Sequence, residues 1–323
     1  MTDFPRPCIV VSKCLGFAAC RYNGQTIPDA FVASLEPYVG FVLVCPEVEI
    51  GLGVPRDPVR VVLVDGERRL LQPATGLDVT ERMWAFAQAF LGSLEAVDGF
   101  ILKGRSPSCG IQEVKVYPPG EKVAAVGKAE GFFGGAVKER FPGWPVEEEG
   151  RLRNFRLREH FLTRLFTLAR FRQARAAGHM QDLVRFHTEH KFLLMAYHQA
   201  QLRQLGRIVA NQAGLAVSEA MVQYEGGLRI ALASPPRPGA VVNVLLHALG
   251  HFRQRLSAHE KAYFLDALAQ YRAQRVPMSV PVGILGAWIA RWDEPYLASQ
   301  RFLAPYPPAL MTLADSGKGR DLD

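Results

Sequence analysis

The sequence contains no apolar run of the roughly 18–20 residues that a membrane-spanning helix requires. Its first residues, MTDFPRPCIVV, lack the basic segment, long apolar core and cleavage site of a secretory signal peptide. Internal repeats and low-complexity segments are also absent. With 49% hydrophobic and 21% charged residues over 323 positions, the chain has enough apolar material for two globular domains. We expect a cytoplasmic protein that does not bind a membrane.

Cysteine and histidine are scarce and unevenly placed. The five cysteines form no C-x-x-C pair, and all eight histidines lie after residue 150. These absences argue against a zinc finger in the first half and against a disulfide framework, because a reducing cytoplasm keeps thiols free. Four of the five cysteines lie within the first 45 residues, which indicates metal binding or catalysis.

Charge divides the chain into two parts. Residues 1–150 contain 15 Lys and Arg against 19 Asp and Glu, whereas residues 151–323 contain 23 against 12. This contrast predicts two domains with separate functions. A basic domain suits a polyanion such as nucleic acid, although an ordinary basic helical domain explains the charge equally well.

Short apolar runs alternate with helical patterns in the first part. The runs at 8–11, 40–45 and 99–104 predict buried strands, and the apolar spacing after Thr80 predicts a helix with Thr80 as its N-cap. The alternation predicts a doubly wound α/β domain with a mostly parallel sheet over residues 1–150.

A basic region with helical periodicity follows a segment rich in Gly, Pro and acidic residues at 141–152. Strand patterns are nearly absent beyond that segment. We therefore predict an all-α domain over 151–313, and a disordered tail over 314–323. The helical patterns cover 154–178, 183–210, 240–256 and 258–274.

Three cysteines, Cys14, Cys45 and Cys109, each lie at or after the end of one predicted strand. The carboxyl ends of neighbouring parallel strands meet at the ligand-binding edge of an open sheet, so we expect these thiolates to lie close together. Three thiolates suit a zinc site or an iron–sulfur centre. The wide spacing and the lack of a nearby histidine favour a cubane cluster with one iron free of protein ligands. The alternative is that each cysteine is an ordinary packing residue.

Polar residues near these cysteines are candidates for catalysis and substrate binding. Glu47, two residues after Cys45, is a candidate general acid or base. Ser106 and Ser108 flank Cys109, where we expect them to donate hydrogen bonds to a cluster sulfide or a substrate. The alternative for Glu47 is a capping or exposed carboxylate. We expect Cys8 and Cys20 to be structural. The candidate substrate-binding residues are Ser12, Lys103 and Ser108.

The first 155 residues contain five ordered motifs: VSKCLGFAACRYNG, CPEVEIGLGVPRDP, TGLDVT, LKGRSPSCG and PVEEEGRL. Together these motifs resemble the thiouracil desulfidase family. The resemblance implies removal of sulfur from a thiolated pyrimidine by a [4Fe–4S] cluster that is bound to Cys14, Cys45 and Cys109. It also implies Glu47 as the acid–base carboxylate and Ser106 as the assisting serine.

The second part contains HTEHKFLLMAY, NVLLHALGHF, EKAYFLDALAQYR, VPVGILGAW and PYLASQRFL. These stretches resemble the helical domain that is often fused behind desulfidase domains. Such fusions are associated with desulfurising 4-thiouridine in tRNA, and the resemblance implies that the helical domain binds RNA.

Basic residues recur along the predicted helices, where they could follow a phosphate backbone. The pairs His187/His190 and His247/His251 have a spacing that is compatible with a metal, but no further ligand pattern follows them. We therefore prefer RNA contact or core hydrogen bonding for these histidines. The candidate nucleic-acid contacts are Arg56, Arg156, Arg164, His187 and Lys191.

We expect a desulfidase that hydrolyses the C–S bond of 4-thiouridine in tRNA and gives uridine and hydrosulfide without net redox change. In this hypothesis the iron without a protein ligand binds the substrate sulfur, while Glu47 activates water or transfers the proton. The base would leave its stack to reach the site. Two alternatives remain: a desulfidase of free thiouracil or thiouridine with a structural helical domain, and a non-catalytic iron–sulfur protein that binds RNA.

Overall fold

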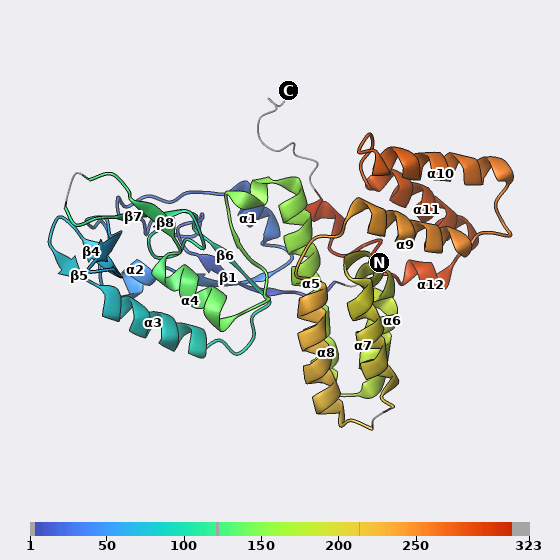
Figure 1. The fold of residues 1–323 in the computed structure, drawn as a ribbon, viewed down its shortest axis with the longest axis horizontal. Helices are drawn as coiled ribbons and strands as arrows, with labels where there is room; N and C mark the ends of the chain where they lie inside the picture. Colours follow the sequence, from blue (N-terminus) through green and yellow to red (C-terminus); the bar gives the residue numbers. More distant parts are fainter. Residues whose placement is uncertain (1–3, 121–122, 213, 312–323) are drawn as a thin grey trace. The chain divides into compact units, whose positions relative to one another are not determined.

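The computed structural model describes residues 4–120, 123–212 and 214–311 (Figure 1). The predicted disordered tail at 314–323 lies outside these residues. Within the described ranges, no helix is both long and apolar enough to cross a membrane.

The chain folds as two compact units. The first contains the residues up to Ala169 and those from Pro307, and the second is Arg170–Tyr306. Helix α5 (Phe155–Ala177) contributes residues to both. A compact unit does not by itself have a function, so the functional domains assigned above, 1–150 and 151–313, stay a prediction.

A four-stranded parallel sheet organises the first unit. Its strands are β1 (Cys8–Ser12), β2 (Gly40–Val44), β6 (Gly99–Leu102) and β9 (Val146–Glu148), in the order β2-β1-β6-β9. All three pairings are parallel, which confirms the predicted α/β fold. The chain runs outward from β1 to β2 and then returns past β1 to β6. Open α/β sheets bind ligands at such a reversal, outside the carboxyl ends of the strands.

A second, five-stranded sheet accompanies the first, in the order β5-β4-β3-β7-β8, and only its β3–β7 pairing is parallel. Its hairpin turns at Asp65 and Gly66, whose φ angles are 49° and 83°. The Asp-Gly dipeptide predicts this turn, because both central residues of a type I′ turn need positive φ. The strands are β3 (Arg60–Val64), β4 (Glu67–Gln72), β5 (Leu77–Asp78), β7 (Val114–Tyr117) and β8 (Gly127–Ala129).

The predicted N-cap at Thr80 is wrong, because Val79 occupies that position and Thr80 is the first helical residue. The hydroxyl of Thr80 instead accepts a hydrogen bond from the backbone N–H of Leu70 at 2.8 Å. This contact ties the helix to strand β4. The helices of this part are α1 (Ala30–Leu35), α2 (Pro46–Glu49), α3 (Thr80–Gly92), α4 (Phe132–Arg140) and the 3₁₀ turn η1 (Arg151–Arg153).

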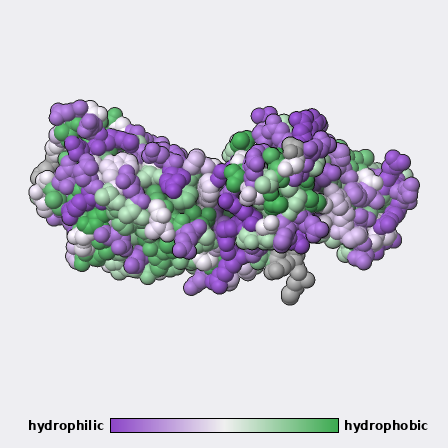
Figure 2. All heavy atoms as spheres, turned by 90° about the horizontal axis from the view of Figure 1, so that it is seen from below, coloured by the Kyte–Doolittle hydropathy of each residue, from purple (hydrophilic) through white to green (hydrophobic). Residues whose placement is uncertain are grey.

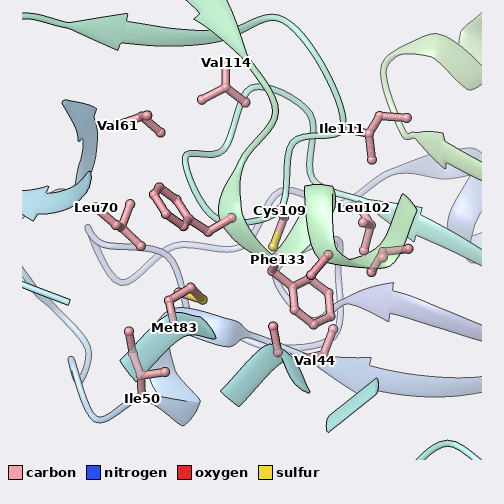
Figure 3. Packing of buried hydrophobic residues seen from close by; sticks show 14 of the residues in the cluster. Val44, Ile50, Val61, Leu70, Met83, Leu102, Cys109, Ile111, Val114 and Phe133 are labelled. Carbon is pink, nitrogen blue, oxygen red and sulfur yellow. The ribbon is translucent and has the colours of Figure 1, made fainter. Parts of the chain in front are cut away.

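The core of the first unit joins both sheets to α3 and α4. Figure 3 shows Val61 and Leu70 of the second sheet, Met83 of α3 and Phe133 of α4 in one apolar cluster. Cys109 belongs to the same cluster and is 6% exposed. The loop that carries Cys109 is therefore built directly on the core.

The second unit is helical, as predicted, and Figure 2 shows polar side chains over much of its visible face. The predicted helix at 183–210 is divided in two at His198, whose φ and ψ are −157° and 92°. The His198 side chain caps the second helix by accepting from the N–H of Gln201 at 3.3 Å. The helices are α6 (Met180–Tyr197), α7 (Gln199–Ala210), α8 (Val217–Ala231), α9 (Pro238–Gly250), α10 (Ala258–Arg272), α11 (Ser279–Trp292) and α12 (Pro295–Ala298), and the 3₁₀ turn η2 (Pro308–Leu310) follows.

Two histidines of α6 contribute to the helical core. His190 is fully buried, stacks on Phe186 and bonds its carbonyl at 2.7 Å through Nδ1. His187 Nδ1 lies 3.0 Å from the hydroxyl of Tyr224 on α8. Burial, assisted by the charge of Lys191, lowers the pKa of His187 to about 4, and burial also lowers the pKa of His190 well below its ordinary value.

We predict that acid destabilises this helical core. The folded-state pKa of His187, about 4, lies below the unfolded value of about 6.5. The contribution of the neutral imidazole to the free energy of unfolding is therefore complete above about pH 6.5 and is lost as the pH falls toward about 4. Lowering the pH from about 7 to about 5 should therefore remove about 2 kcal/mol of unfolding free energy through His187 alone. Urea unfolding followed by circular dichroism measures this loss.

The variant His187→Asn keeps a polar atom near the position of Nδ1, but asparagine does not titrate. The free energy of unfolding of this variant should therefore depend less on pH than that of the wild type. His259→Gln, at an exposed position, is the matched control and should leave the dependence unchanged. Equal pH slopes for wild type and His187→Asn would contradict the prediction.

Candidate functional site

A cavity of about 710 Å³ opens at the carboxyl ends of β1, β2 and β6. It has the size of a small-molecule site, and it lies at the chain reversal where α/β sheets bind ligands. The strand ends contribute Ser12, Cys14, Val44, Cys45, Glu47, Lys103, Ser106 and Cys109 to its lining, and the second sheet contributes Arg60, Val61, Val114, Lys115, Tyr117 and Lys128.

The structure brings Cys14, Cys45 and Cys109 together at this cavity. Cys14 follows β1 by two residues, Cys45 directly follows β2, and Cys109 lies in the loop after β6. Because β1 pairs with both β2 and β6 in parallel, residues far apart in sequence share one end of the sheet. Cys20 also lines the cavity, whereas Cys8 begins β1 at the opposite end of the strand.

Burial makes these thiols costly to ionise on their own. It raises the pKa of Cys14 to about 11 and that of Cys45 to about 12, and it raises the pKa of Cys109 well above its ordinary value. Neighbouring thiolates raise each pKa further. A bound metal centre would compensate for this cost by taking up the thiolate charge.

The donor set fits an iron–sulfur cluster better than a lone zinc ion. No histidine is among the described residues that line the cavity. Cysteines that bind a [4Fe–4S] cluster attach to different irons, so they stand around a larger volume.

Glu47 is fixed at the cavity wall from two sides. Its Oε2 accepts hydrogen bonds from Arg56 Nε at 2.9 Å and Nη2 at 2.6 Å. Its Oε1 accepts from Ser108 Oγ at 2.9 Å. The carboxylate therefore has one orientation, which a general acid or base requires.

Arg56 and Ser108 lie in places that differ from their predicted roles. The Arg56 side chain is only 4% exposed, and it also donates to the carbonyl of Cys20 at 3.0 Å. This position suits a partner of Glu47 better than a contact to an RNA backbone. Ser108 is 0% exposed and donates to Glu47, so it orients that carboxylate, and its contact with a substrate stays a prediction.

The remaining two serines hold the backbone around Cys109. Ser106 Oγ accepts from the N–H of Cys109 at 3.1 Å and from that of Ser108 at 3.3 Å. Ser12 Oγ accepts from the N–H of Lys103 at 2.9 Å, and a hydrogen bond from Ser12 partly offsets the effect of burial on the Cys109 thiol. Both serines line the cavity, although only 1% of Ser12 is exposed.

Lys103 also lines the cavity and forms a hydrogen-bonded ion pair with Glu149. Sequence reasoning identified Lys103 but missed Glu149, although the PVEEEGRL motif was the available signal. Glu149 lies 46 positions after Lys103, and the pairing of β9 with β6 brings the two together.

The first turn of α4 supports the Cys109 loop through its backbone. The N–H groups of Gly131, Phe132 and Gly134 donate to the carbonyls of residues 110, 107 and 108 at 2.8, 3.1 and 3.0 Å. A Cβ at position 134 would lie 2.3 Å from Gly110 O and 2.5 Å from Cys109 O. Only glycine allows the helix to approach the loop this closely.

The four RNA candidates outside the cavity have different environments. Arg156 and Lys191 are exposed. Arg164 is half-buried and donates to the carbonyl of Gly143 at 2.8 Å, and His187 is half-buried against Tyr224. A role in binding RNA stays a prediction for all four.

Two family profiles match separate parts of the chain. The family described as "2-thiouracil desulfurase" matches residues 9–149, and the one described as "Protein of unknown function (DUF1722)" matches residues 191–307. "Uncharacterized protein YbgA" of Escherichia coli K12 is 25% identical over 158 residues, which are 48% of this chain and 93% of that protein. "Uncharacterized protein YbbK" of Bacillus subtilis 168 is 36% identical over 109 residues, which are 32% of this chain and 72% of that protein.

A solved structure, "[4Fe-4S]-dependent thiouracil desulfidase TudS", is 29% identical to this chain and has a TM-score of 0.35. The match covers 46% of this chain and 93% of the solved one.

We predict that Gly134→Ala destabilises the first unit by about 1–3 kcal/mol, because its methyl group would overlap two carbonyl oxygens of the Cys109 loop. Urea unfolding of the cluster-free chain measures this loss.

Gly135→Ala is the matched control, since its Cβ would meet only the flexible Glu130 side chain, at 3.3 Å. That variant should be neutral or slightly stabilising. Unfolding of both variants at the urea concentration of the wild type would show that position 134 has room for a methyl group.

Proposed function

The chain belongs to the 2-thiouracil desulfurase family, and we propose that it is a desulfidase that converts 4-thiouridine in tRNA to uridine by hydrolysis of the C4–S bond. The observation that carries this proposal is the arrangement of one cavity, where the buried Cys45 and Cys109, the half-buried Cys14 and a fixed carboxylate meet at the ends of parallel strands.

We assign Cys14, Cys45 and Cys109 as the ligands of a [4Fe–4S] cluster. When bound by three cysteines, such a cluster supplies a Lewis-acidic iron that can take the sulfur of the substrate. No electron donor or acceptor is needed, because the reaction exchanges sulfur for oxygen at one carbon without a change of oxidation state.

Glu47 is the acid–base residue of this proposal. Its carboxylate takes one proton from the water whose oxygen attacks C4, and it returns that proton to the departing sulfur, which leaves as hydrosulfide. The second proton of the water passes from the C4 hydroxyl to solvent as the C4=O bond of uridine forms. The C4–S bond breaks, a C4–O bond forms, and the products are uridine and hydrosulfide. Arg56 and Ser108 hold the carboxylate in place throughout through their hydrogen bonds to its two oxygens.

The helical region supports RNA as the carrier of the thiolated base. Residues 151–323 contain 23 Lys and Arg against 12 Asp and Glu, and Arg156 and Lys191 are exposed. A polynucleotide would bind such a surface through its phosphates. The target base would leave its stack to enter the cavity, as other base-modifying enzymes require.

We predict that Glu47→Gln lowers turnover by about 10²–10⁴-fold while the bound iron is retained, because the amide cannot accept the proton. The assay is anaerobic: the reconstituted protein is mixed with tRNA that contains 4-thiouridine, and loss of the thiocarbonyl absorption band is followed.

Glu49→Gln is the matched control, since Glu49 is an exposed carboxylate on the same short helix. It should keep wild-type turnover. Full activity of Glu47→Gln would remove Glu47 from the mechanism, and inactivity of the wild type on every thiolated substrate would overturn the proposed function.

We also predict that activity on tRNA falls steeply as salt is raised, while activity on free 4-thiouridine changes little, because only the polynucleotide releases counterions. Lys191→Glu should weaken tRNA binding and reduce the slope of log affinity against log salt by about 1. Free 4-thiouridine is the internal control. Turnover of the nucleoside with salt-independent or absent tRNA binding would assign this chain to small-molecule substrates.

A further inference from the structure

We propose that Glu148 and Glu149 are positioning residues that clamp the two ends of the loop 103–111, so that Cys109 faces the cavity in a fixed geometry. The inference rests on the proposed function only in taking Cys109 as a cluster ligand. Both glutamates come from the end of β9, which runs parallel to β6 with Glu148 opposite Leu102. The loop begins immediately after Leu102.

Glu149 holds the first end of the loop. Its Oε2 accepts from the N–H of Gly104 at 2.7 Å, and its Oε1 binds the ammonium group of Lys103. The side chain is 8% exposed. One carboxylate therefore fixes both a backbone group and a cavity-lining cation at the start of the loop.

Glu148 holds the other end. Its Oε1 accepts from the N–H of Ile111 at 2.9 Å, and its side chain is 6% exposed. The second oxygen packs against the start of the loop, because a Cβ on Gly104 would lie 3.0 Å from Glu148 Oε2. The same carboxylate thus touches residues at both ends of the loop that carries Cys109.

Two adjacent buried carboxylates are an unusual arrangement, since each disfavours the charge of the other. Burial, and then the charge of Glu149, raises the pKa of Glu148, while the N–H groups of Ile111 and Gln112 lower it. Burying a charged carboxylate costs free energy unless hydrogen bonds replace those that it made with water. Here the loop backbone supplies those hydrogen bonds, which ties the glutamates to the conformation of the loop.

The middle of the loop has its own supports, Ser106 and the first turn of α4, so the carboxylates have a distinct task at its ends. Without them the start of the loop would keep the Ser12 contact to the Lys103 N–H, and its other end the contact of Gly110 with α4, but both ends would be less firmly held. Residues around metal ligands that fix their orientation commonly change metal affinity by about 10- to 100-fold when they are removed.

The test compares Glu148→Ala and Glu149→Ala with Glu147→Ala. Glu147 lies beside them on β9, but its carboxylate bonds Arg151, at 2.7 and 3.3 Å, and not the loop. Each chain is reconstituted anaerobically, and removal of iron by a chelator is timed without any substrate. We expect iron loss to be about 10- to 100-fold faster in the first two variants and unchanged in Glu147→Ala.

Two further substitutions at each glutamate separate positioning from folding. Glu148→Gln and Glu149→Gln keep an oxygen acceptor for the loop N–H, so they should restore most of the iron retention and the electron paramagnetic resonance signal of the reduced cluster. Glu148→Asp and Glu149→Asp keep the charge but shorten the side chain, so they should lose iron while circular dichroism stays that of the wild type.

The inference is overturned if the alanine and aspartate variants retain iron as the wild type does, or if Glu147→Ala loses it equally fast. Because no thiolated substrate enters this experiment, a wild type that holds its cluster but lacks desulfidase activity would refute the proposed function alone.

Discussion

The parallel pairing of β1 with both β2 and β6 is the constraint on which the site depends. It places residues 14, 45 and 109 at one end of one sheet, although 95 positions separate the first from the last. Without that pairing the three cysteines would be isolated buried thiols. With it, their burial disfavours the thiolates unless a metal centre takes up the charge.

The charged side chains around these cysteines are held in place by hydrogen-bonded partners. Glu47 is held by Arg56 and Ser108, and Lys103 is held by Glu149. Each pair is largely buried, so its geometry is set by packing as well as by attraction. A preorganised site of this kind lets a carboxylate act without first changing its orientation.

The sequence predicted the parts of the site that depend on local pattern. The apolar runs before Cys14 and Cys45 are long enough to identify buried strands, and cysteine is rare enough to be noticed there. The pattern could not show that Arg56 pairs with Glu47, because the two are nine positions apart and the chain after α2 is irregular. Nor could it show the break at His198, since the helical periodicity continues through it. The sequence predicted the β3–β4 hairpin and a strand at 113–119, but it could not show that they form one sheet, because β3 pairs with β7 about 50 positions later.

The contacts that hold the Cys109 loop are made to its main chain, and this affects how such a site can change during evolution. The contacts from α4, Glu148 and Glu149 reach the loop through its carbonyl and N–H groups. The side chains of Arg105 and Pro107 line the cavity but take no part in those contacts. Pro107 also fixes its own φ angle, and Arg105 has a φ of 59°, so substitutions that fit these backbone angles can alter which molecules are accepted while the loop keeps its shape.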